Sequence, residues 1–74
     1  MTHKIETPAQ FKSARLAQRL TQAELAAIMR LPNPVMTGYE TISKWENGKS
    51  RIPGPALVVM EMIATGWRPK GWSK

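Results

Sequence analysis

Apolar residues recur at helical spacing in four short segments of this chain, and turn-forming residues separate the segments. The first segment predicts a helix over residues 8–19, because Thr7 is a suitable N-cap, Pro8 fits the first helical position and Gln10 completes a capping box. Residues 1–6 are expected to be an unpacked lead-in. The inward side of the helix is predicted to hold Phe11, Ala14, Leu16 and Leu20. The polar side is predicted to hold Lys12, Arg15, Gln18 and Arg19.

A second helix is predicted over residues 22–29, where Thr21 and Glu24 are spaced as another capping box. The prolines within the next stretch, Leu-Pro-Asn-Pro at 31–34, remove backbone donors and disfavour helix in the residues before them. We therefore expect residues 30–36 to form a loop. Val35 and Met36 are the candidates for anchoring that loop on the core.

The third segment, residues 39–49, predicts one short amphipathic helix. Ile42 and Trp45 are spaced to face inward, and Asn47–Gly48 is a typical helix end. An isolated helix needs about 12–15 residues to persist in water, so this one depends on the rest of the chain to hold it.

The start of this third helix is less sharply defined. Thr37 and Glu40 have capping-box spacing, which places the start near Gly38 or Tyr39. Because glycine is a poor helix former, the first turn is expected to be mobile.

The fourth helix begins at Pro55 and is closed by Gly66. It is apolar on nearly every side, so it either fills the core or buries a second face against a partner. A basic tail follows it. Trp67 is expected to pack on the fourth helix, whereas Trp72 is compatible with a dimer contact, a DNA contact or disorder.

Composition narrows the classes of function. The 74 residues suffice for one domain that buries about 60% of its unfolded surface. There is no cysteine, and the lone His3 is expected to be solvated, so no metal site is predicted. The net charge of +6 favours nucleic acid as a partner, with an anionic membrane surface second; charge that serves only solubility is the other reading.

Several other classes are disfavoured. No apolar run is long enough for a membrane span or a signal peptide, which predicts a cytoplasmic protein without membrane contact. The five carboxylates are scattered, and the chain lacks a catalytic triad pattern and a glycine-rich phosphate loop. We therefore expect no catalysis and no cofactor.

Two segments together resemble the lambda-repressor/Cro-like (XRE) helix-turn-helix family. They are Arg-Leu-Thr-Gln-Ala-Glu-Leu-Ala-Ala-Ile-Met at 19–29 and Thr-Ile-Ser-Lys-Trp-Glu-Asn-Gly-Lys at 41–49. The resemblance covers about residues 8–65 and implies an all-α, compact domain of four to five helices, followed by the tail at 66–74. Family members usually join the paired helices by a short turn with a glycine; this chain has about six more residues there, giving an extended loop.

The resemblance also implies a surface for double-stranded DNA, with the third helix in the major groove. Gln22 matches a phosphate-binding position, and Tyr39, Glu40 and Lys44 match base-reading positions. Lys44 is equally suited to a guanine or a phosphate, and for Glu40 structural capping is the better explanation. Thr41 and Ser43 have short hydroxyls suited to phosphate or adaptable base contacts, although Thr41 is equally compatible with facing the turn. The positions that match the family loop that grips the DNA backbone after the third helix are Asn47, Lys49, Ser50 and Arg51. Glu46 matches the family position that pairs with a basic residue of the first helix, here Arg15.

The function implied is a sequence-specific transcriptional repressor, a homodimer on an inverted-repeat operator, autoregulatory and of prophage, toxin–antitoxin or anti-CRISPR-associated type. The expected dimer interface is Leu57, Val58, Met62, Ile63 and Trp67. The alternative is an antitoxin whose main role is to bind and neutralise a partner toxin. A basic amphipathic membrane binder is a weaker third reading, because the cations are not gathered on one helix.

Overall fold

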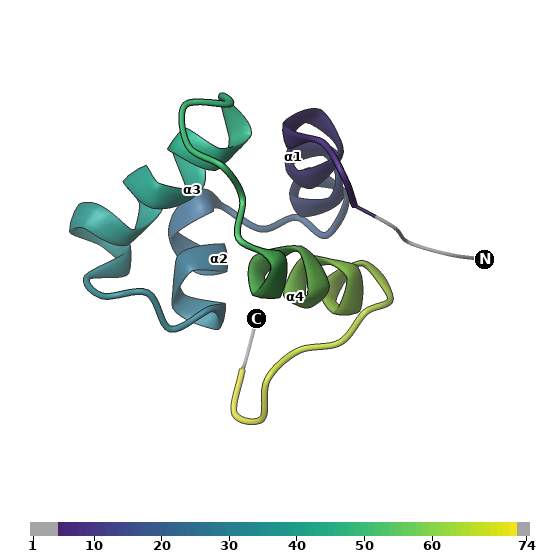
Figure 1. The fold of residues 1–74 in the computed structure, drawn as a ribbon. Helices are drawn as coiled ribbons and strands as arrows, with labels where there is room; N and C mark the ends of the chain where they lie inside the picture. Colours follow the sequence, from purple (N-terminus) through teal and green to yellow (C-terminus); the bar gives the residue numbers. More distant parts are fainter. Residues whose placement is uncertain (1–4, 73–74) are drawn as a thin grey trace.

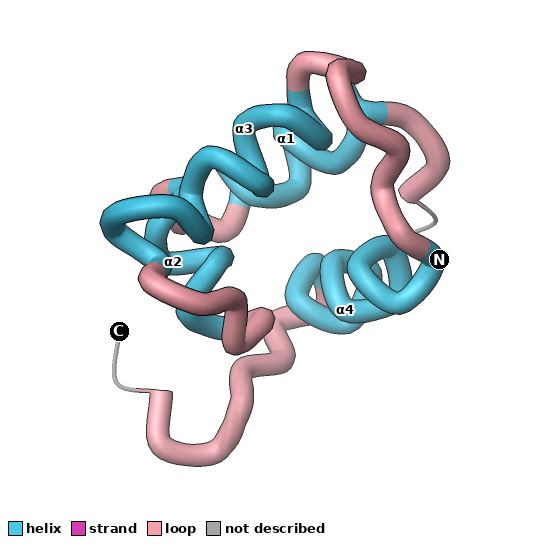
Figure 2. Tube along the Cα trace, turned by 60° about the vertical axis from the view of Figure 1, so that its left-hand side comes forward, coloured by secondary structure: helices cyan, strands magenta, loops and turns pink. Residues whose placement is uncertain are grey.

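The four α-helices form in the segments that the apolar spacing predicts, whereas the predicted loop over 30–36 enters a π-helical turn at residue 34. The computed structural model describes residues 5–72, and this part of the chain contains helices and loops but no strands (Figure 2). His3 and Lys74 lie outside the described residues. The elements in chain order are α1 (Pro8–Ala17), α2 (Gln22–Ile28), a π-helical turn η1 (Pro34–Gly38), α3 (Tyr39–Glu46) and α4 (Gly54–Ala64). The all-α prediction is confirmed.

Local capping starts the first two helices. The Thr7 hydroxyl accepts a hydrogen bond from the Gln10 backbone N–H at 3.1 Å, and the Gln10 side chain accepts one from the Thr7 N–H at 3.0 Å. Thr21 and Glu24 make the same reciprocal pair at 3.0 and 2.8 Å. Both predicted capping boxes are therefore confirmed.

Each of the four α-helices in residues 5–72 ends in a Schellman motif, in which one residue adopts the left-handed conformation. In α3 and α4 this residue is glycine, Gly48 and Gly66. In α1 and α2 it is Arg19 and Arg30, each with φ of 58°. The first helix therefore ends before residue 19, because Arg19 turns the chain although it is not the glycine that usually marks such an end.

The start of α3 differs from the prediction. The N-cap is Gly38 without a side-chain capping bond, and the Thr37 hydroxyl donates instead to the Pro32 carbonyl at 3.4 Å, so the third capping box is wrong. Gly38 is buried, and a Cβ there would lie 3.0 Å from the Pro32 oxygen and 3.2 Å from the Ala26 Cβ. The glycine thus permits close packing of the start of α3 against α2.

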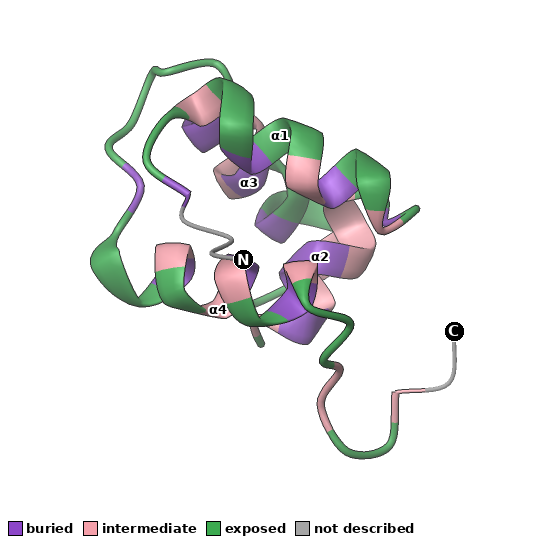
Figure 3. Ribbon diagram, turned by 90° about the vertical axis from the view of Figure 1, so that its right-hand side faces the viewer, coloured by how far each residue is buried: buried purple, intermediate pink, exposed green. Residues whose placement is uncertain are grey.

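The core lies between the four helices, and buried faces turn inward in Figure 3. α3 packs against α2 and α1, and α4 packs against α1. The rings of Phe11 and Trp45 meet edge to face, with centroids 5.9 Å apart. Ile42 and Trp45 are buried as predicted. The largest fully buried side chains are Phe11, Leu25, Ile42, Met60 and Ile63.

The burial of four residues was predicted wrongly. Leu16, expected in the core, is 56% exposed, while Arg15, expected on the polar side, is buried. Arg15 replaces Leu16 inside because it has a buried partner in Glu46. Val35 and Met36 do not anchor the loop; they are exposed on η1.

The segments that flank the helices are packed more closely than predicted. Ile5 is buried, and its backbone N–H donates to the Glu61 carboxylate at 3.0 Å, so this end of the lead-in is not unpacked. After α4 the tail turns away and back, as the yellow trace in Figure 1 shows. Trp72 packs against the core, whereas Trp67 is 39% exposed and its backbone N–H donates to the Met62 carbonyl at the end of α4.

The left-handed Arg30 gives a stability prediction. Arg30→Gly should raise the free energy of unfolding by about 0.5–1 kcal/mol, because glycine adopts this conformation without the steric cost of a Cβ. Lys12→Gly, on the exposed side of α1, is the control and should lower it by about 1 kcal/mol. Urea unfolding measures both; a loss of stability in Arg30→Gly would contradict the assigned backbone conformation.

Candidate nucleic-acid interface

The outward face of α3 carries a shallow hollow of about 310 Å³. Helical spacing creates it: positions 39, 43 and 47 lie one turn apart along one side of the helix, and 40 and 44 lie beside them. The six residues that line it are Tyr39, Glu40, Ser43, Lys44, Asn47 and Lys49. All six were predicted site residues, so the structure brings most of the predicted set together.

The chemistry of this hollow is polar and adaptable. Lys44 and Lys49 are exposed cations, and Glu40 is an exposed anion that makes no capping bond. The Asn47 amide donates to the Ser43 hydroxyl at 3.2 Å, which holds these two side chains together. The surface therefore offers donors, acceptors and one aromatic ring, Tyr39, on a helical backbone.

Two predicted residues lie outside the hollow on the helices. Thr41 is half-buried on α3. Gln22, the first residue of α2, donates from its amide to the Glu46 carboxylate at 3.1 Å. This bond joins residues 24 positions apart, so no local sequence pattern indicates it. It gives Gln22 a structural contact in addition to the predicted phosphate contact.

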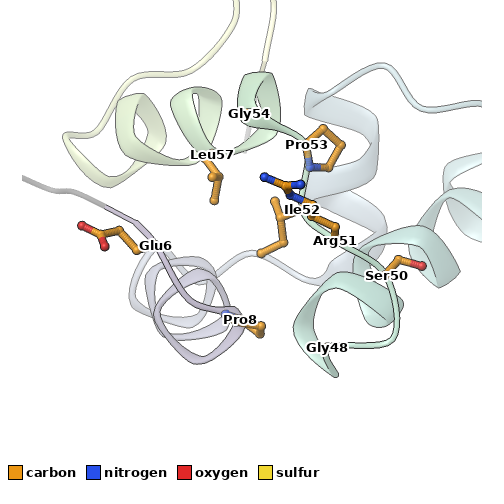
Figure 4. A pocket seen from close by; sticks show the side chains of 9 residues that line it. All are labelled: Glu6, Pro8, Gly48, Ser50, Arg51, Ile52, Pro53, Gly54 and Leu57. Carbon is orange, nitrogen blue, oxygen red and sulfur yellow. The ribbon is translucent and has the colours of Figure 1, made fainter.

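Ser50 and Arg51 line a different groove, of about 610 Å³ (Figure 4). Its walls come from the start of α1, the loop after α3 and the first turns of α4. Figure 4 shows the Arg51 guanidinium turned toward the space between α1 and α4, with the Glu6 carboxylate pointing away from it. The loop begins close to α3, because the Ser50 N–H donates to the Lys44 carbonyl at 3.3 Å.

A buried ion pair fixes α3 relative to the rest of the domain. Arg15 donates from Nε and Nη2 to the two Glu46 carboxylate oxygens at 2.6 and 3.0 Å. Its Nη1 donates to the Leu20 carbonyl at 2.8 Å. Both side chains are nearly inaccessible, with exposed fractions of 8% and 2%. The predicted Arg15–Glu46 pair is confirmed, and it is buried rather than exposed.

The predicted dimer residues differ in accessibility. Val58, Met62 and Trp67 are 56%, 40% and 39% exposed, and Leu57 is half-buried. Ile63 has no exposed surface, because it packs in the core. Its inclusion in an intermolecular interface was therefore wrong.

Comparison with known proteins identifies one family. A family model described as helix-turn-helix matches residues 11–60, which include α2, η1, α3 and the hollow on α3. Searches of the curated proteins and of the solved structures gave no significant match. Among residues 5–72, no helix is long and apolar enough to cross a membrane.

The buried pair gives a second stability prediction. Glu46→Gln should lower the free energy of unfolding by about 3–5 kcal/mol, because it leaves the Arg15 charge buried without its counter-charge. The control is the double variant Arg15→Met/Glu46→Leu, which should be close to wild type since neither buried charge remains. Thermal and urea unfolding measure both; a change below about 1 kcal/mol in Glu46→Gln would contradict this role for the pair.

Proposed function

The chain belongs to the lambda-repressor/Cro-like helix-turn-helix family of DNA-binding transcription regulators, and from that premise we propose that it is a sequence-specific repressor. It binds double-stranded DNA as a homodimer on an inverted-repeat operator, and one such operator lies at its own promoter. The observation that carries this proposal is the set of six polar residues around the hollow on α3.

In helix-turn-helix proteins the second helix of the motif lies in the major groove and presents its N-terminal side chains to base edges. In this chain that helix is α3. Lys44 donates to guanine O6 or N7, and Tyr39 contacts a base or a phosphate near the start of the helix. Glu40 is exposed and makes no capping bond, which leaves its carboxylate available to accept a hydrogen bond from a cytosine amine.

The DNA backbone is held by residues around α3. Thr41 and Ser43 offer short hydroxyls for phosphates or bases, and Gln22 approaches a phosphate from the start of α2. The loop after α3 supplies further contacts through Asn47, Lys49, Ser50 and Arg51. The excess of cations, a net charge of +6, supports this sequence-independent part of the binding.

Dimerisation follows from the small size of one reading helix. A single α3 contacts only a few base pairs, whereas two copies on half-sites about 34 Å apart combine their affinities. Three exposed apolar residues and one half-buried residue, Leu57, support this interface; the exposed ones are Val58, Met62 and Trp67.

The same apolar residues favour a second candidate function. An antitoxin would use the exposed parts of Val58, Met62 and Trp67 to cover a partner toxin, with DNA binding as an added activity. Stable co-purification with the product of a neighbouring gene would favour the antitoxin over the repressor.

Two substitutions separate base reading from backbone binding. Lys44→Ala should flatten the preference among operator variants, because it removes a base contact worth about 1–3 kcal/mol of discrimination. Arg51→Ala should weaken binding to all sequences alike. It should also reduce the magnitude of the slope of log affinity against log salt concentration by about one, because one phosphate contact is lost. Lys70→Ala, in the tail, is the charge-matched control. Equilibrium titrations at several salt concentrations measure these effects; uniform loss in both variants would make Lys44 a phosphate contact.

The dimer has its own test. Val58→Glu should convert a dimer into a monomer at tens of micromolar and lower operator affinity by about tenfold or more, because a charge enters the interface and half-sites are then bound independently. Leu16→Glu is the matched control, since Leu16 has the same exposed fraction of 56%. Sedimentation measures the mass; a wild-type monomer both with and without operator would refute the dimer.

A further inference from the structure

The most exposed large apolar side chains of the described residues are neighbours in the sequence. Val35 is 72% exposed and Met36 is 70% exposed, and both belong to η1. Neither contributes to the hydrophobic core. Folding removes little of the apolar surface of these two side chains from water. Covering that surface with a partner would therefore be favourable.

The backbone that carries this pair is held in place. The Asn33 carbonyl oxygen accepts hydrogen bonds from the backbone N–H groups of Met36, Thr37 and Gly38, with N···O distances of 2.9, 2.8 and 2.8 Å. Gly38, at the end of the turn, is buried against α2. Val35 and Met36 are therefore presented on a defined turn, so little backbone entropy is lost when they are covered.

The turn extends α3 at its N-terminal end. Gly38 and Tyr39 have right-handed helical backbone angles, so η1 continues into α3 without a break. Tyr39, four residues after Val35, already lines the hollow on α3. The pair thus lies beside the end of the helix whose side chains meet base edges in this family.

The turn that carries the pair has no acidic residue of its own. No acidic residue occurs between Glu24 and Glu40, and Arg30 lies within that interval. Glu40, four residues after Met36, lines the hollow on α3, where the proposed function pairs it with a cytosine amine. The apolar group that the major groove offers is the C5-methyl of thymine.

We infer that Val35 and Met36 contact thymine methyl groups in the major groove, at the edge of the half-site read by α3. This inference rests on the proposed DNA-binding function and assigns a specificity role to the residues inserted between the two motif helices. The contact adds discrimination for thymine without a hydrogen bond, because burial of the methyl group favours thymine over the other bases.

The test combines a protein change with the removal of single methyl groups from DNA. Wild type and Val35→Ala/Met36→Ala are titrated with an operator selected from random DNA, in which each thymine is replaced in turn by uracil. Uracil keeps the hydrogen-bonding edge and lacks only the methyl group. Leu16→Ala, another exposed apolar residue, is the control for a general effect of truncation.

We expect uracil at one or two positions of each half-site to lower wild-type affinity about fourfold, the effect of losing one buried methyl group. The double variant should bind the thymine operator more weakly and lose its sensitivity to uracil at those positions. Leu16→Ala should behave as wild type.

Unchanged affinity of the double variant, or the same uracil sensitivity as wild type, would overturn the inference. A change in the sedimentation of the free double variant would overturn it too, by assigning the pair to a protein contact. Binding without any selected sequence would instead refute the proposed function itself.

Discussion

The buried pair of Arg15 and Glu46 sets the position of the helix on which the proposed function depends. Removing two charges from water costs several kcal/mol each, and good geometry with further hydrogen bonds must offset this cost. Here the guanidinium bonds both carboxylate oxygens and the Leu20 carbonyl, and Gln22 donates to the same carboxylate. The network joins α1, α2 and the last turn of α3, so it fixes both the angle and the rotation of α3. Lys44 lies two residues before Glu46, so the network also sets the position of the Lys44 backbone.

Local chemistry made much of this fold predictable. Capping boxes at Thr7 and Thr21 and the inward spacing of Ile42 and Trp45 are signals within one or two helical turns. The rest depends on contacts between distant segments. The burial of Arg15 in place of Leu16 requires Glu46, 31 residues away. The role of Gly38 requires the neighbouring surface of α2, and the left-handed arginines give no glycine signal.

In the candidate site, too, some features follow from local sequence and others depend on contacts between distant segments. Six predicted residues meet around one hollow because helical periodicity alone places them on one face of α3. Arg51 lies in another groove, since the path of the loop after α3 is set by packing between α1 and α4. The sequence pattern could not show that Ile63 is buried and Val58 is exposed, because α4 is apolar on both its buried and its exposed sides. The packing of α4 against α1 and the rest of the core decides which side of α4 is available to a second copy.

If α3 reads bases and two copies act together, the wild-type protein should select a defined sequence from random double-stranded DNA. We expect enrichment of one inverted repeat with half-site centres about 10 base pairs apart, or one helical turn. Recovery of sequences no different from the starting pool, with binding that depends only on salt, would contradict it.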